Sequence, residues 1–296
     1  MIIGIAGNTS KPNVKKVISD FVDYLHSIHV GYVVASELKS FLRLENDQPT
    51  VPLQKIGNHC DVVIAFGGDG TLLYTASKVG ESGVPILGVN TGVLGFLTEV
   101  VVDELRSSIQ ELVQGHYAIL ERMVLDVAVE RPGGGFTYQA LNDVVVDKGK
   151  GARLITVEVS VDDVFLNRIR SDGVIIATPT GSTAYSLSAG GPLLEPTMQA
   201  VIVTPICPHS LTVRPIVLSG DRELKICLLS GDSMAQINID GQFQFNLSRE
   251  DVVRIKRAEY SLKWISMGKR DFYEILRTKL NWGADWVNFP EKGNSK

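Results

Sequence analysis

Residues 61–73 have the sequence DVVIAFGGDGTLL, in which an apolar run passes directly into three glycines around one carboxylate. The apolar run predicts a strand in a parallel sheet that is covered on both faces. The residues that follow, Leu72–Val79, are compatible with a helix. Because α/β sheets bind ligands at the carboxyl ends of their strands, the loop between this strand and helix is the expected binding edge, and Asp69 lies in it.

The composition of this loop indicates that it binds phosphate. Glycine lets a phosphate approach the backbone closely and presents N–H donors to it. The alternative is a tight strand-to-helix turn that needs its glycines only for steric reasons. The chain contains neither a GxGxxG dinucleotide fingerprint nor a GxxxxGK[ST] P-loop, so the phosphate is handled in another way. The predicted phosphate-binding residues are Gly67, Gly68, Gly70 and Thr71.

Strands and helices alternate through the first third of the chain. A helix is expected from Pro12, behind Thr9 or Ser10 as its cap, and another at residues 102–114. This βαβ order predicts an α/β domain built on a parallel, Rossmann-like sheet. Besides the strand at 61–66, strands are expected at residues 2–6, 32–35 and 84–89.

After residue 117 the pattern changes to β-type segments separated by turn signals, which predicts a β-rich domain. One of these segments is expected to form a single strand over residues 138–146. A helix at Lys269–Leu280 has its apolar side chains on one side and is expected to pack back on the first domain. The expected division is an α/β domain of residues 1–116, completed by 268–296, and a β-rich domain of residues 117–267.

Composition excludes several classes of protein. The net charge of −4 and the lack of any Lys/Arg run argue against a nucleic-acid partner. The three cysteines are scattered, without the spacing of a disulfide framework or a zinc site, so we expect no metal ligands of the protein's own and a reducing, cytoplasmic location. No stretch approaches 18 apolar residues, so no membrane anchor is expected.

Several motifs together resemble one family. The GGDGT loop resembles the signature shared by NAD kinases, diacylglycerol-type lipid kinases and 6-phosphofructokinases, which leaves the acceptor open. The run TPTGSTAYSLSAGGP at residues 178–192 resembles the long signature of NAD kinases; physically it suggests a turn followed by a short helix that Ser182 or Thr183 would cap. Further resemblances follow in the family's order at residues 88–97, 141–143, 170–173 and 205–215.

This resemblance implies an enzyme that moves the terminal phosphoryl group of ATP, or of polyphosphate, to the 2′-hydroxyl of the adenosine ribose of NAD. Asp69 would be the general base, since a positioned carboxylate can take the hydroxyl proton. Mg²⁺ would arrive with ATP, NAD would lie between the domains, and the family implies a homodimer or homotetramer. Implied around the dinucleotide are Asn90, Phe96, Asn142, Asp143, Arg170, Asp172, Thr183, Ala184, Tyr185 and Ser188.

Plainer interpretations stand beside these. Asn142-Asp143, where the family usually has Asn-Glu, could be a turn or bulge between strands, and Asp172-Gly173 could be a hairpin turn. Asp240-Gly241 is assigned to a turn. For the whole protein, a lipid or sphingoid-base kinase would share GGDGT without needing residues 178–192, and a non-catalytic dinucleotide sensor would keep the pocket without turnover.

Overall fold

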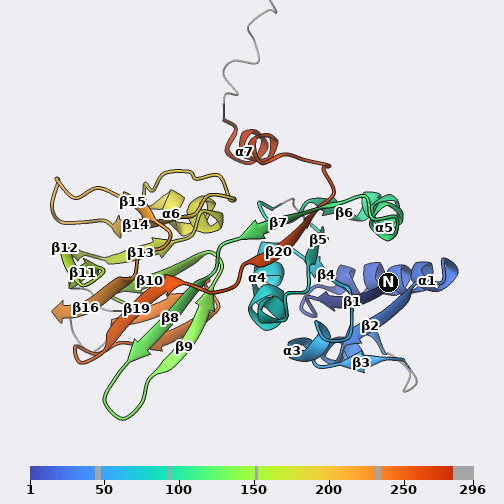
Figure 1. The fold of residues 1–296 in the computed structure, drawn as a ribbon, viewed down its shortest axis with the longest axis horizontal. Helices are drawn as coiled ribbons and strands as arrows, with labels where there is room; N and C mark the ends of the chain where they lie inside the picture. Colours follow the sequence, from blue (N-terminus) through green and yellow to red (C-terminus); the bar gives the residue numbers. More distant parts are fainter. Residues whose placement is uncertain (44–47, 93–94, 151–152, 231–234, 283–296) are drawn as a thin grey trace, which may run out of the picture.

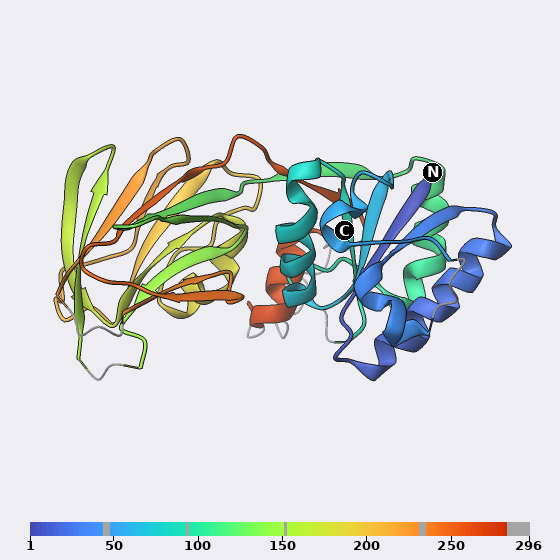
Figure 2. The same cartoon turned by 90° about the horizontal axis from the view of Figure 1, so that it is seen from below.

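The structure is a computed structural model that describes residues 1–43, 48–92, 95–150, 153–230 and 235–282. It has two parts side by side, an α/β domain and a β-sandwich (Figure 1). In the view from below, α4 (Asp69–Val79) and α7 (Phe272–Leu280) both lie between the sandwich and the rest of the α/β domain (Figure 2). Among the described residues, no helix combines the length and apolar character needed to cross a membrane.

The α/β domain is built on a mostly parallel sheet of eight strands, as the βαβ pattern predicts. The strand at the glycine loop is buried at all six positions, because helices cover both faces of the sheet. Along the sheet the order is β3-β2-β1-β4-β5-β20-β7, with β6 beside β5. The strands are β1 (Ile2–Gly7), β2 (Gly31–Ala35), β3 (Thr50–Val51), β4 (Val62–Gly67), β5 (Ile86–Asn90), β6 (Val100–Val101), β7 (Ala118–Arg122) and β20 (Leu262–Ser266).

The helices of this domain follow the predicted order. The first begins at Pro12 as expected, but neither Thr9 nor Ser10 caps it: Lys11 is the N-cap residue and makes no side-chain cap. Ser10 instead donates its N–H at 2.8 Å and its hydroxyl at 2.6 Å to Oδ1 of Asn8. The helices are α1 (Pro12–Ser27), α2 (Lys39–Leu42), α3 (Leu53–Ile56), α4 and α5 (Leu105–Val113), with the 3₁₀ turns η1 (Ser36–Leu38), η2 (Gly80–Ser82) and η3 (Val102–Glu104).

The second part is a sandwich of two antiparallel six-stranded sheets, so the predicted β-rich domain is confirmed. Its core is formed by the alternating inward side chains of both sheets. One sheet has the order β15-β14-β13-β10-β17-β18 and the other β12-β11-β16-β19-β8-β9. The bounds are β8 (Leu125–Glu130), β9 (Phe136–Ala140), β10 (Asp143–Asp147), β11 (Ile155–Val161), β12 (Val164–Ser171), β13 (Gly173–Ala177), β14 (Ala200–Ile206), β15 (Ile216–Ser219), β16 (Leu224–Ser230), β17 (Gln236–Ile239), β18 (Phe243–Asn246) and β19 (Val252–Arg257), with η4 (Thr180–Thr183) and α6 (Tyr185–Ser188) after β13.

The connection between the domains differs from the expected division at residues 116 and 268. β7 and β20 extend the sheet of the α/β domain: β20 runs parallel to β5, and β7 pairs antiparallel with β20, Leu120 lying opposite Trp264. The chain therefore enters the sandwich after β7 and leaves it before β20. The local sequence pattern could not predict this domain boundary, because β7 and β20 pair although they are more than a hundred residues apart in the chain.

The C-terminal helix packs on the α/β domain as predicted. Before it, Lys269 pairs with Glu111 at 2.8 Å and Arg270 pairs with Glu104 at 2.9 Å, both on the segment that forms η3 and α5. The helix begins at Phe272 and not at Lys269, because Asp271 is its N-cap and accepts a hydrogen bond from the backbone N–H of Glu274 at 2.6 Å. Lys279 on this helix lies over the ring of Phe96.

Candidate active site

Asp69 stands where the sequence predicts it, at the junction of β4 and α4. It is the first residue of α4, and its carboxylate accepts hydrogen bonds from the backbone N–H groups of Phe96 at 2.8 Å and Leu97 at 3.1 Å. These bonds hold both oxygens in a defined orientation. Gly68 and Gly70 on either side face open space, so a ligand can approach the backbone here.

Gly95 leaves room for this carboxylate. A Cβ at this position would lie 1.9 Å from Oδ1 of Asp69, so any side chain would displace the acid. We expect Gly95→Ala to lower turnover by about 10–100-fold with little loss of stability, because a shift of about 1 Å in a reacting group has effects of this size. Gly92→Ala is the matched control, since a Cβ at Gly92 meets nothing within 4 Å. Equal activity of the two variants would show that the position of the Asp69 carboxylate is unimportant.

Asn90 stabilises the loop whose backbone N–H groups bind the Asp69 carboxylate. It is buried at the end of β5, donates through Nδ2 to Oγ1 of Thr98 at 2.7 Å, and accepts from the N–H of Gly92 at 2.6 Å. Oγ1 of Thr98 also accepts the N–H of Gly95 at 3.0 Å. These bonds give Asn90 a positioning role for the loop that holds Asp69.

A second group of predicted residues is organised by Asp240. Its carboxylate accepts the backbone N–H groups of Leu141 at 2.8 Å, Asn142 at 2.8 Å and Asp143 at 3.0 Å. These three N–H groups belong to the break between β9 and β10, so the single strand expected over 138–146 is two strands in different sheets. The turn interpretation of Asp240-Gly241 is correct, with φ of 53° at Asp240, but it missed this role of the carboxylate.

The long motif at residues 178–192 packs against the same break. Thr178 donates its N–H to the carbonyl of Asn142 at 2.9 Å and its hydroxyl to the carbonyl of Leu141. Gly181 is required here, because a Cβ would lie 2.0 Å from the carbonyl oxygen of Asn142. The expected cap is absent: Ser182 instead exchanges hydrogen bonds with the backbone of Leu194 at 3.1 and 3.2 Å, and Thr183 bonds the carbonyl of Thr180 at 3.3 Å.

The two segments enclose a cavity of about 250 Å³. Four of the predicted residues line it, namely Asn142, Asp143, Ala184 and Tyr185, and Asp147, Asn238, Asp240 and Gly241 join them from strands β10 and β17 and the turn after β17. The sequence signal that could have found Asp240 is its place in an Asp-Gly pair directly after the alternating strand at 235–239.

Two carboxylic acids that line this cavity, Asp143 and Asp240, have raised pKa values because they are buried. Burial, followed by the charge of Asp240, raises the pKa of Asp143 to about 7. Burial also raises the pKa of Asp240 to about 6, against the three N–H groups that favour its ionised form. The cavity thus favours partners that supply hydrogen-bond donors or positive charge.

The raised pKa of Asp143 predicts a fall in stability as pH rises. The unfolded chain releases this proton near pH 4 and the folded chain near pH 7, so the folded state binds more protons in between and loses stability across that window. Asp143→Asn should flatten the dependence and stabilise the protein at pH 8 by about 1–3 kcal/mol, measured by urea unfolding at pH 5 and pH 8. Asp162→Asn, at an exposed acid whose pKa is lowered by Arg222, is the control. An unchanged slope in Asp143→Asn would refute the assignment.

The other predicted residues lie around these two groups or away from them. Thr183 and Phe96 line a neighbouring cavity of about 380 Å³ beneath α7. Asp172 is half-buried and forms an ion pair with Lys148 at 2.6 Å. Lys148 directly follows Asp147 in the chain. Arg170 and Ser188 are exposed and line none of these cavities. The structure therefore gathers predicted residues into two groups, one around Asp69 and one around the cavity of about 250 Å³, and leaves Arg170 and Ser188 outside both.

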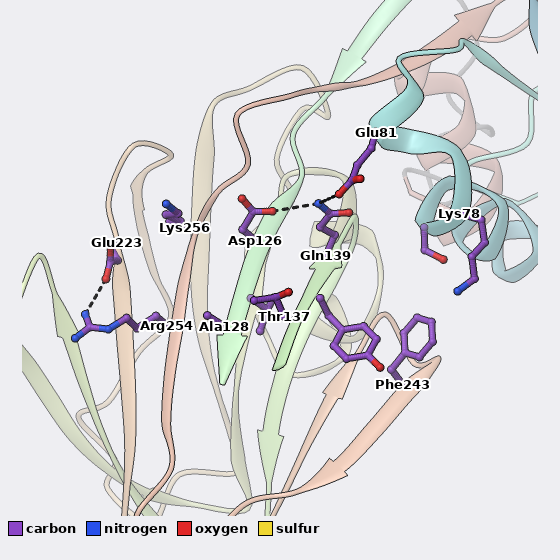
Figure 3. A pocket seen from close by; sticks show the side chains of 13 residues that line it. Lys78, Glu81, Asp126, Ala128, Thr137, Gln139, Glu223, Phe243, Arg254 and Lys256 are labelled. Atoms are coloured by element: carbon purple, nitrogen blue, oxygen red, sulfur yellow. Dashed lines mark hydrogen bonds and ion pairs between the residues drawn. The ribbon is translucent and has the colours of Figure 1, made fainter. Parts of the chain in front are cut away.

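A larger groove of about 650 Å³ lies between α4 and the outer face of the sandwich, and it contains none of the predicted residues. Four of its charged groups, Glu81, Asp126, Glu223 and Arg254, already have partners (Figure 3). Gln139 donates to Glu81 at 2.8 Å and to Asp126 at 3.3 Å, while Arg254 pairs with Glu223 at 2.8 Å. This groove lies where the two domains meet, and it is not the candidate active site.

The glycine loop, its carboxylate and the two-domain scaffold define a phosphotransferase without a P-loop. Two family models match the chain: the ATP-NAD kinase N-terminal domain at residues 3–117 and the ATP-NAD kinase C-terminal domain at residues 141–267. The chain therefore belongs to the NAD kinase family. These findings give no support to a lipid kinase or a non-catalytic sensor.

Individual relatives agree along nearly the whole chain. The NAD kinase of Moorella thermoacetica is 40% identical over 95% of this chain and 90% of its own, and that of Desulforamulus reducens is 40% identical over 97% and 98%. Yeast NADH kinase, solved with NADH, superposes with a TM-score of 0.85 at 27% identity, covering 99% of this chain and 90% of that one. The NAD kinase of Archaeoglobus fulgidus, solved with ATP, gives 0.71 at 26% identity, covering 96% and 98%.

Proposed function

We propose that this enzyme transfers the terminal phosphoryl group of ATP to the 2′-hydroxyl of the adenosine ribose of NAD, giving NADP and ADP. The observation that supports this assignment most strongly is the Asp69 carboxylate, held by two backbone N–H groups beside an open glycine loop. The complexes of the yeast relative with NADH and of the archaeal relative with ATP agree with both substrates.

In the proposed reaction, Asp69 accepts the proton of the 2′-hydroxyl. The ribose oxygen forms a bond to the terminal phosphorus of ATP as the bond from that phosphorus to the bridging oxygen breaks, and ADP leaves with the bonding electrons. The N–H groups of Phe96 and Leu97 each occupy one lone pair of the carboxylate, which leaves the remaining lone pairs for the hydroxyl. Most of the catalysis is then positioning of the two substrates.

The acceptor is assigned to the cavity lined by Asn142, Asp143, Ala184 and Tyr185. A neutral Asp143 can donate a hydrogen bond, whereas an ionised one accepts. The exposed ring of Tyr185 supplies a flat apolar face for a base. Incubating the pure protein with ATP and NAD, and then adding an NADP-dependent dehydrogenase with its substrate, tests the function. Formation of NADPH is the expected result, and its absence under conditions where the protein is folded would overturn the proposal.

We also propose that Mg²⁺ reaches the site bound to ATP. Within the described parts of the chain, no cluster of three or more His, Cys, Asp or Glu side chains could hold a metal ion. When bound, Mg²⁺ offsets the negative charge on the phosphates. Activity should therefore be lost on chelation and return with Mg²⁺, while the protein dialysed without nucleotide should contain far less than one metal ion per chain by elemental analysis. Stoichiometric metal after dialysis would contradict this.

Assembly and location complete the proposal. A homodimer or homotetramer is supported by the exposed apolar side chains of the edge strand β15, where Ile216 is 38% and Val217 is 43% exposed. A cytoplasmic location is supported by the free thiols of Cys60, Cys207 and Cys227. Light scattering after size-exclusion chromatography would give the mass in solution, and a monomer at micromolar concentration would contradict the assembly.

The dehydrogenase-coupled assay described above also tests whether inorganic polyphosphate can replace ATP as the phosphoryl donor.

A further inference from the structure

Helix α4, which begins with Asp69, contacts the β-sandwich at both of its ends. In its first turn, the carbonyl oxygen of Gly70 accepts a hydrogen bond at 3.2 Å from Nε2 of Gln242, a residue in the turn between β17 and β18. In its last turn, the ammonium of Lys78 lies 5.2 Å from the centroid of the Phe243 ring (Figure 3). The helix that carries the proposed base is therefore held by two consecutive residues of the other domain.

The interface between these two contacts is closely packed. Ala76 and Ser77 of α4, with Leu141 and Asp240 among others, line a space of only about 10 Å³, which is at the lower limit for one water molecule. Leu141, whose N–H donates to the Asp240 carboxylate at 2.8 Å, belongs to the hydrophobic core of the α/β domain. Helix α4 therefore cannot shift relative to the Asp240 turn without opening this interface.

The side-chain amide of Gln242 is oriented by the group that it contacts. A carbonyl oxygen only accepts hydrogen bonds, so the amide must turn its NH₂ group toward Gly70. Its Oε1 atom is then buried and has no hydrogen-bond partner among the residues that the structure describes. Because a buried acceptor without a donor lowers stability, packing alone would favour an apolar side chain at this position. What the amide contributes is the hydrogen bond to Gly70.

The turn that carries Gln242 also organises the acceptor cavity. Asp240 lies two residues earlier, and its carboxylate binds the N–H groups of residues 141–143. Gln242 itself lines none of the cavities described above, so its role is not direct binding of a substrate there. On its other side, Gly70 directly follows Asp69. One turn thus contacts both the segment that lines the acceptor cavity and the helix that starts with the base.

We propose that Gln242 is a positioning residue for phosphoryl transfer, whose hydrogen bond to Gly70 holds the Asp69 carboxylate in place relative to the acceptor cavity. The inference rests on the proposed function and adds how a base on one domain stays aligned with an acceptor bound mainly by the other. Because the bond joins the domains, its loss lets the base move away from the hydroxyl, and a displacement of about 1 Å can lower a rate about 100-fold.

The first test compares Gln242→Met with Gln244→Met. Methionine is close to glutamine in length but has no amide, so it keeps the packing and removes the hydrogen bond. We expect Gln242→Met to lower the turnover number by about 10–100-fold and to leave the KM values for NAD and ATP within about 3-fold, because neither substrate loses a contact. Gln244 is exposed on β18 and donates to Oε1 of Gln236 within the sandwich, so Gln244→Met should match the wild type.

A double variant distinguishes positioning of the base from support of the fold. If Gln242 acts only through the position of Asp69, adding Gln242→Met to Asp69→Asn should change the remaining turnover by less than about 2-fold, because the carboxylate that it aligns is gone. An amide that supports the fold would instead lower turnover by the same factor in both backgrounds. Gln242→Met should also have the Tm of the wild type or a higher one, because the unpartnered oxygen has been removed.

A third measurement needs no turnover. Amide hydrogen exchange at residues 69–72, in the first turn of α4, should be faster in Gln242→Met than in the wild type and unchanged in Gln244→Met. The N–H groups of Thr71 and Leu72 donate to the carbonyl of Gly68 at 2.9 and 3.2 Å, so their exchange reports directly on this turn.

Any of four results for Gln242→Met would overturn the inference: unchanged turnover, unchanged exchange at residues 69–72, an equal loss of turnover with and without Asp69, or a lower Tm or failure to fold. A wild-type protein that does not phosphorylate NAD would contradict the proposed function instead. Hydrogen exchange would still report on the bond between Gln242 and Gly70 in that case, so the two failures are distinguishable.

Discussion

Asp69→Asn lowers the turnover number for NADP formation by about 10²–10⁴-fold, the range of a positioned general base, while the dissociation constant for NAD stays within a few-fold. The amide is nearly the same size as the carboxylate, and its oxygen can still accept one of the N–H groups of Phe96 and Leu97. What it cannot do is take the hydroxyl proton. Steady-state kinetics and NAD binding by calorimetry measure the two quantities separately.

Asp61→Asn is the matched control for this substitution. Asp61 precedes the other end of β4, is exposed, and accepts the N–H of Ile2 at 2.6 Å. Its replacement should leave turnover unchanged. Full activity of Asp69→Asn would remove Asp69 from the role of base, and an equal loss in NAD binding would make it a residue that binds the acceptor.

Asp240→Ala should lower the free energy of unfolding by about 2–4 kcal/mol. The carboxylate accepts three backbone N–H groups, from residues 141 to 143, and each buried donor left without a partner costs about 1–3 kcal/mol. Part of this is offset because burial also penalises the charge of Asp240, as its raised pKa shows. Urea unfolding at pH 7 gives the value. The same variant should lose NAD binding, since the segment it holds lines the acceptor cavity.

Asp162→Ala separates the role of the carboxylate from that of the turn. Asp162 also has a positive φ, of 49°, and its carboxylate accepts the N–H of Glu223 and pairs with Arg222, but it is exposed. Water can satisfy the groups that its removal exposes, so the loss of stability should be much smaller than that of Asp240→Ala. Similar losses in the two variants would mean that the turn backbone, and not the burial of the three N–H groups, sets the stability of this region.

The two parts of the active site differed in how far they could be predicted. Asp69 and its glycines lie within one strand and the start of one helix, so their arrangement followed from a contiguous run of residues. Asn142, Asp143, Ala184 and Tyr185 were named by resemblance, and the structure places them around one cavity. The carboxylate that holds two of them, Asp240, was assigned only to a turn, because its partners are 97 to 99 residues away.

By itself, the sequence determined most of the strands and helices, the change from α/β to β architecture, and the carboxylate at the glycine loop. Those properties depend on local periodicity and on backbone freedom, which neighbouring residues decide. Tertiary structure alone decided that β7 and β20 complete the first sheet and that Asp240 anchors the break at residues 141–143. Pairing and burial depend on residues far away in the chain, and no local pattern encodes which distant donor or acceptor will arrive.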